Sequence, residues 1–157
     1  MELRREGPFP RLALPDLDGV PREIEECWAA GEALVLIGHR NCKTTRQTIP
    51  YVDRIHRRRG AGHAVLVVLQ DDAATARGLA QDLGLEVPLR LEADPYPLAA
   101  ELRLVAVPTL FLIRQDGTIA KTTEAFHRAD LEEYAARLGN GSPLFTPEDR
   151  APAMKPG

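Results

Sequence analysis

The segment VLIGHRNCKTTRQTIP (residues 35–50) places one cysteine, Cys42, between an apolar run and a segment with helical spacing. The apolar run over residues 33–39 has the length and continuity of a buried central strand. Residues 43–59 are predicted to form a helix, because their apolar positions recur every three residues. Cys42 is therefore expected where a buried strand gives way to a helix, and Pro50 is expected inside that helix.

Strand and helix patterns alternate along the rest of the chain. Strands are expected within residues 11–19, 63–70 and 87–94, helices over 21–31, 72–84, 95–104 and 128–139, and a β-hairpin over 108–124. The first of these helices is expected to begin at Pro21. Buried strands that alternate with helices favour a mainly parallel sheet with helices on both faces, and the hairpin adds antiparallel strands.

The length of 157 residues suits one domain, which we assign to residues 1–139. Residues 140–157 carry four prolines and no periodicity. They are expected to form a Pro-rich C-terminal tail that is mobile or lies along the surface.

Composition limits the function classes. The net charge of −3 gives no electrostatic reason to expect nucleic acid as a partner. No apolar run approaches the roughly 18 residues of a membrane span, and no apolar leader follows the first charges, so we expect a cytoplasmic protein with no membrane partner. The two cysteines and four histidines show no metal-ligand spacing, so neither a metal nor a cofactor is expected. The oligomeric state is not indicated.

Taken in order, these features resemble the thioredoxin superfamily, near its TlpA/ResA-like thiol-disulfide oxidoreductases and peroxiredoxin-like proteins. GPFPRLALPDLDG is similar to the entry segment of that branch, Cys42 and Pro50 match its active-site helix, and VAVPTLFLIRQDGTI is similar to its cis-proline segment. Residues 72–94 resemble its inserted helix and strand. The resemblance implies a thioredoxin-like three-layer α/β/α fold with a mixed central sheet, an inserted helix-strand and a C-terminal β-hairpin.

The setting of Cys42 favours a reactive thiol. A helix N-terminus offers free N–H groups and the positive end of the helix dipole, both of which stabilise a thiolate. Three neighbours add positive charge and are expected to contact the substrate: His39, Arg40 and Lys43. The hydroxyls of Thr44 and Thr45 are expected to donate to the sulfur, and we assign Thr45 to the catalytic site together with Cys42.

The resemblance also assigns a substrate-binding segment. It implies that Pro108 is cis and packs against Cys42, and that the backbone of Val107 pairs with substrate peptide. Thr109 is expected to flank the site.

The chain departs from the family at Thr45, where a dithiol protein has its second cysteine. Cys27 is not expected to replace it within one molecule, because the strand between Cys27 and Cys42 separates them by roughly 20 Å, whereas a disulfide needs Cα atoms within about 7 Å. A disulfide of Cys27 between two molecules stays open, and packing in the core is the expected role. The hypothesis is a monothiol thiol-disulfide oxidoreductase in cell redox homeostasis, with antioxidant activity. Its mixed disulfide is resolved by an external thiol, either glutathione or a thioredoxin-type reductant.

Two alternatives stay open. One is a redox-inactive binding module of thioredoxin fold, which the replacement of family residues by Asn41, Thr45 and Thr48 favours. The other is a one-cysteine peroxiredoxin-like peroxidase, although His39 and Pro108 stand where that family has its threonine and arginine.

Overall fold

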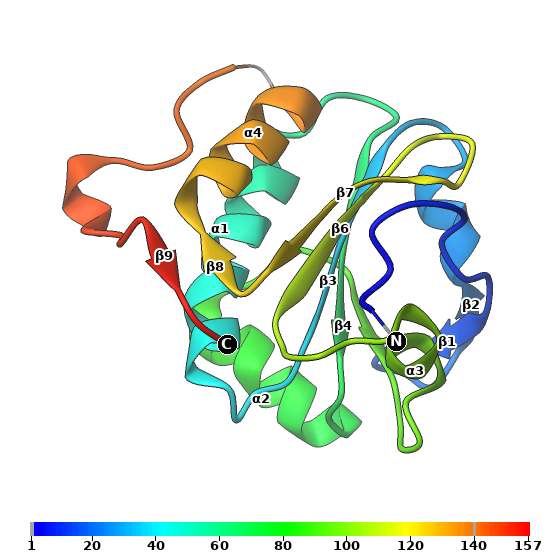
Figure 1. Cartoon of the computed structure of the whole chain (residues 1–157). Coiled ribbons are helices and arrows are strands. Elements are labelled where there is room, and N and C mark those ends of the chain that lie inside the picture. The colour runs from blue at the N-terminus through cyan, green and yellow to red at the C-terminus, as the bar shows by residue number, and fades with distance from the viewer. Residues whose placement is uncertain (1, 140) are drawn as a thin grey trace.

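A mixed five-stranded sheet forms the centre of the computed structural model, which describes residues 2–139 and 141–157 (Figure 1). The strand order is β5-β4-β3-β6-β7. Its members are β3 (Ala33–Gly38), β4 (Ala64–Leu69), β5 (Leu89–Leu91), β6 (Thr109–Ile113) and β7 (Ile119–Glu124). β3, β4 and β5 are parallel, whereas β6 and β7 are antiparallel to their neighbours. This confirms the expected fold class, including the hairpin and the inserted helix and strand.

Helices cover both faces of the sheet. They are α1 (Lys43–Arg58), α2 (Ala73–Leu83), α3 (Pro97–Leu102), α4 (Arg128–Leu138) and the 3₁₀ helix η1 (Ile24–Trp28). One face packs against α1, α2 and α4, and the other against η1, α3 and the N-terminal segment (Figure 1). Within the described ranges, no helix has the length and apolar content needed to cross a membrane.

The central strand β3 shows why the sheet needs cover on both faces. Its side chains alternate with a period of two, as in any strand. Leu34 and Leu36 join the core under α1, whereas Val35 and Ile37 join the core on the opposite face, and all four are fully buried. Such a strand fixes the position of the loop that follows it, and that loop leads to Cys42.

The prediction that a helix begins at Pro21 is wrong for the first turn of that helix. Residues Pro21–Glu23 form strand β2, which pairs antiparallel with β1 (Ala13–Pro15), and only η1 is helical. The carboxylate of Asp16 accepts from the N–H groups of Asp18 (2.9 Å) and Val20 (3.0 Å), which closes a tight turn between the two strands. Pro15 lies opposite Pro21, and neither has an N–H group to leave unpaired.

The ends of the other elements follow their sequence signals. Asp72 caps α2 by accepting from the N–H of Thr75 (2.8 Å), and Gly84 ends that helix with a φ of 61°. Gly117, with a φ of 90°, lies in the turn between β6 and β7. The strand and helix signals of these segments are thus confirmed.

The C-terminal residues 141–157 cross α4 and α1. Leu144 is fully buried and Phe145 nearly so, in the core beneath these two helices. The chain then forms the 3₁₀ helix η2 (Pro147–Asp149) and strand β9 (Met154–Lys155), which pairs antiparallel with β8 (Phe126–His127). The burial of this segment depends on one apolar pair, Leu144 and Phe145. Two residues form no periodic pattern, so the sequence does not indicate that they are buried.

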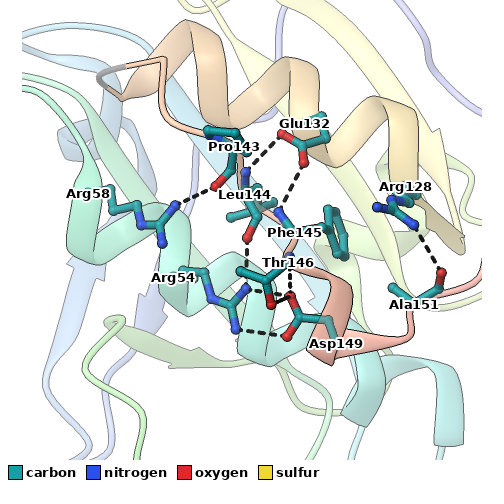
Figure 2. Close-up of polar contacts among 10 residues, drawn as sticks. All are labelled: Arg54, Arg58, Arg128, Glu132, Pro143, Leu144, Phe145, Thr146, Asp149 and Ala151. Carbon is teal, nitrogen blue, oxygen red and sulfur yellow. Dashed lines mark hydrogen bonds and ion pairs between the residues drawn. The ribbon is translucent and has the colours of Figure 1, made fainter.

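Polar contacts anchor the first half of this segment, as Figure 2 shows. The guanidinium of Arg54 donates to the carbonyl of Leu144 (2.7 Å) and to the carboxylate of Asp149 (3.0 Å). This pairing lowers the pKa of Asp149 to about 2. The carboxylate of Glu132 accepts from the N–H groups of Leu144 and Phe145, both at 3.0 Å. We call residues 143–149 the anchor.

A buried carboxylate, Asp53, ties α1 to the segment before β5. Burial raises its pKa, but hydrogen bonds from Arg57 (2.7 Å) and from the N–H groups of Val87 (2.7 Å) and Glu86 (2.8 Å) outweigh burial and hold the pKa below its usual value. Asp53→Asn is expected to lower the free energy of unfolding by about 2 kcal/mol at pH 7, since a hydrogen bond to a charged group contributes about 1.5–3 kcal/mol.

The pH dependence of that loss has a defined sign. Because the folded-state pKa is depressed, the carboxylate of Asp53 stabilises the fold above the unfolded pKa of about 3.9. This stability is lost as pH falls through the folded value. Urea unfolding of both proteins at pH 7 and pH 3 is expected to show a smaller difference at pH 3, and an equal difference would contradict this account. Asp82→Asn, exposed in α2, is the control, with an expected change within about 0.5 kcal/mol.

Candidate active site

Cys42 is the N-cap residue of α1, and three residues that form a turn separate it from the end of β3. Its N–H donates to the carbonyl of His39 (3.2 Å), and its carbonyl accepts from the N–H of Arg46 (3.1 Å). The sulfur makes no capping hydrogen bond, and the first turn of α1 contains no acidic residue. The positive end of the helix dipole is therefore not offset within its own first turn, and Cys42 as a residue is half-buried beside it.

The loop before β6 lies against this sulfur. The thiol of Cys42 donates to the carbonyl of Val107, with 3.4 Å between sulfur and oxygen. The peptide bond between Val107 and Pro108 is cis. Thr109 is buried, and its hydroxyl donates to the carbonyl of Ala106 (2.8 Å), which holds the loop in shape. Cys42 and Val107, which are 65 positions apart in the chain, thus meet at one point.

The two threonine hydroxyls do not donate to the sulfur, so that expectation is wrong. Thr44 is nearly buried, and its hydroxyl donates to the carbonyl of Pro156. Thr45 is fully buried and packs so closely beneath Gly38 that a Cβ on that glycine would lie 2.7 Å from the Thr45 methyl group. Within the described ranges, the Thr45 hydroxyl has no hydrogen-bond partner. Its position is that of a packing residue beneath the active-site turn.

The three basic residues assigned to the site, His39, Arg40 and Lys43, are near Cys42 in sequence but do not bind its sulfur. His39 is half-buried, whereas Arg40 and Lys43 are exposed. The backbone N–H of Arg40 donates to the carboxylate of Asp71 (2.9 Å), and its carbonyl accepts from the guanidinium of Arg46. In the part of the chain that is described, none of the three predicted residues hydrogen-bonds to the sulfur.

A hollow of about 230 Å³ lies at the ends of β4 and β5 and carries several carboxylates. Among them, Glu92 is buried and accepts from the N–H groups of Leu98 and Ala99, the latter at 3.3 Å. The carboxylate of Glu92 therefore caps the N-terminal end of α3. Across residues 2–139 and 141–157, no three His, Cys, Asp or Glu side chains are grouped to hold a metal ion.

The second cysteine, Cys27, lies in η1 on the other side of the sheet's central strand. Burial raises the pKa of its thiol to about 11, so it is protonated at neutral pH. Cys27 precedes β3 and Cys42 follows it, and six strand residues span about 20 Å. Both cysteines are free, in agreement with the expected separation.

Residues Pro156 and Gly157 also lie at this site, which was not expected from the sequence. The carbonyl of Pro156 receives the hydroxyl of Thr44, and Gly157 lies against the loop before β6. A Cβ at Gly157 would be 2.2 Å from the Val107 carbonyl oxygen, so the two backbones are in direct contact. No motif in the tail indicates this placement.

Comparison with known proteins gives structural matches only. No protein-family model and no curated protein matches the sequence. Among solved structures, the thioredoxin domain of a thiol-disulfide oxidoreductase from Bacteroides vulgatus is 17% identical with a TM-score of 0.74, over 88% of this chain and 100% of that one. A thioredoxin family thiol:disulfide interchange protein from Chlorobium tepidum is 15% identical with a TM-score of 0.68, over 88% and 99%. A secreted disulfide oxidoreductase from Mycobacterium tuberculosis is 16% identical with a TM-score of 0.66, over 81% and 96%.

Proposed function

We propose that this chain, which has the thioredoxin-like fold, is a thiol-disulfide oxidoreductase that works through the single cysteine Cys42. The observation that carries the proposal is the contact between the Cys42 sulfur and the Val107 carbonyl, beside the cis peptide bond to Pro108. It places a backbone surface on which a substrate can lie directly beside the sulfur of half-buried Cys42. The structural neighbours that are described as thiol-disulfide oxidoreductases support the same reaction class.

The proposed reaction has two exchange steps. In the first, the Cys42 thiolate attacks one sulfur of a substrate disulfide, so that a mixed disulfide forms and the other substrate sulfur leaves as a thiolate. In the second, an external thiolate attacks the substrate sulfur of the mixed disulfide, and Cys42 leaves as a thiolate. The substrate disulfide has then been exchanged for one with the external thiol, and Cys42 is unchanged in oxidation state.

The external thiol is required because no second cysteine reaches Cys42. Thr45 has no thiol, and Cys27 lies beyond the other end of β3. The substrates proposed are protein or small-molecule disulfides, and the resolving partner is glutathione or a thioredoxin-type reductant. A reducing compartment such as the cytoplasm would supply such thiols.

The uncompensated start of α1 supports the chemistry of the first step. The N-terminal dipole favours a negative charge by about 0.3–1 kcal/mol at exposed positions, and by up to about 2 kcal/mol where the geometry is partly buried. The thiol's hydrogen bond to Val107 is a weak interaction at 3.4 Å. Negative charge that develops on the sulfur during exchange therefore lies beside the positive end of the α1 dipole.

Thr45→Cys tests the absence of a resolving thiol. One helical turn from Cys42, a thiol at position 45 is within disulfide reach, and the smaller side chain fits beneath Gly38. When Cys42 carries a glutathionyl group, the variant is expected to release glutathione without added thiol, whereas the unmodified sequence retains it until thiol is added. Mass spectrometry of the intact protein follows the release.

Thr48→Cys is the matched control for this experiment. It places a thiol on the same helix but about 9 Å further along the axis from Cys42, beyond disulfide reach. Retention of glutathione by the Thr45→Cys variant, or equal release by both variants, would show that position 45 is not where a resolving thiol acts.

A further inference from the structure

We propose that residues 151–157, here called the cover, close the substrate side of Cys42 and must lift before a disulfide reaches the sulfur. The proposal rests on the function proposed above for the identity of the substrate. It concerns a regulation of that site by the chain's own C-terminal segment, which lies on the active-site end of α1 (Figure 1).

The last two residues of the cover bridge both walls of the site. On one side, the carbonyl of Pro156 accepts the hydroxyl of Thr44, in the first turn of α1. On the other side, Gly157 lies against the carbonyl of Val107. The same carbonyl accepts the thiol of Cys42, so the cover touches the group that the sulfur itself contacts. A substrate backbone that approached Val107 would meet Gly157 first.

Residues 153–155 of the cover pair with the chain around β8, and this pairing directs the last two residues toward the site. Lys155 pairs with Phe126 and Met154 with His127, in the antiparallel pairing of β9 with β8. The N–H of Arg128 donates to the carbonyl of Ala153 (2.9 Å), which extends the pairing by one bond. The cover is thus an added strand that continues directly over the site.

The cover is held far less firmly than the anchor before it. Leu144 and Phe145 of the anchor are buried, whereas no residue of 151–157 is buried and Met154 is 65% exposed. A cavity of about 300 Å³ lies beneath residues 150–152, between them and α1. Among the described residues 151–157, Ala151 is the one that packs, partly buried, against the core. With so little apolar burial to offset the entropy of ordering, such a segment opens locally at small cost. The anchor keeps the lifted cover close to the site.

Alkylation of Cys42 tests the cover without using disulfide exchange. In a Cys27→Ala background, the rate of reaction is measured with small iodoacetamide and with a large polyethylene glycol maleimide. Gly157→Val places a side chain where the Val107 carbonyl lies, and Thr44→Val removes the hydroxyl that holds Pro156. Each is expected to raise the maleimide rate about fivefold, the effect of losing roughly one hydrogen bond.

Gly78→Ala is the matched control, because a Cβ at Gly78 in α2 would meet no atom within 4 Å. It is expected to leave both rates unchanged. Equal maleimide rates in the two cover variants and the control would overturn the proposal. Because alkylation consumes a thiol without any disulfide, a failure of the proposed exchange reaction would leave these rates as predicted, and the two failures are distinguishable.

Discussion

Cys42→Ser is expected to reduce thiol-disulfide exchange to the uncatalysed background. The serine hydroxyl keeps the size of the side chain and its hydrogen bond to Val107, but it is not ionised near neutral pH and forms no disulfide. A loss of at least about 1,000-fold is expected, as for removal of a nucleophile in other enzymes. The measurement is reduction of a disulfide substrate, with glutathione as the external thiol.

Cys27→Ala is the matched control for the loss of Cys42. Its thiol is protonated at neutral pH, lies across the sheet and contributes only packing. The variant is expected to keep nearly full activity. If Cys42→Ser and the unmodified protein had equal rates of thiol-disulfide exchange, the alternative function would be favoured. In that alternative the chain is a redox-inactive binding module that uses the thioredoxin fold without its thiol.

Leu144→Ala is expected to lower the free energy of unfolding by about 3 kcal/mol, within the range of 2–5 kcal/mol seen for buried leucines. Leu144 is fully buried in the core formed with α1 and α4. For a chain of this length, the loss corresponds to a decrease of about 6–12 °C in the melting temperature. Thermal unfolding followed by circular dichroism measures it.

Met154→Ala is the control in the same segment. Its side chain is 65% exposed, so a change within about 0.5 kcal/mol is expected. If Leu144→Ala were as mild as Met154→Ala, the anchor would not be part of the core, and residues 140–157 would behave as the surface tail that their composition suggested.

The sequence predicted the sheet and the active-site turn because both depend on local, strong signals. A continuous apolar run of strand length is typical of a buried strand, and this placed β3 correctly. The Asp116-Gly117 pair likewise placed the turn between β6 and β7. The contact of Cys42 with Val107 did not follow from these two signals, because the resemblance implied only that Pro108 packs against Cys42 and that the Val107 backbone pairs with substrate.

Other features depended on contacts between distant residues. Pro21 suits a helix start, but the Asp16 turn and the pairing with Pro15 made it part of a strand. Thr44 was expected at the sulfur, and only the position of Pro156, 112 residues away, shows why its hydroxyl points elsewhere. The anchor was missed for the same reason, since two apolar residues among prolines carry no periodic signal.

Formation of a mixed disulfide on Cys42 in the folded protein tests directly whether this cysteine is an exchange thiol. The Cys27→Ala variant, with and without Gly157→Val, is incubated with oxidised glutathione at pH 7 and examined by intact mass spectrometry, with urea-unfolded protein as the reference. We expect one glutathionyl group on Cys42, faster addition when Gly157→Val displaces the cover, and complete removal by added reduced glutathione. If neither folded variant is modified while the unfolded protein is, Cys42 does not act as an exchange thiol, and the account is contradicted.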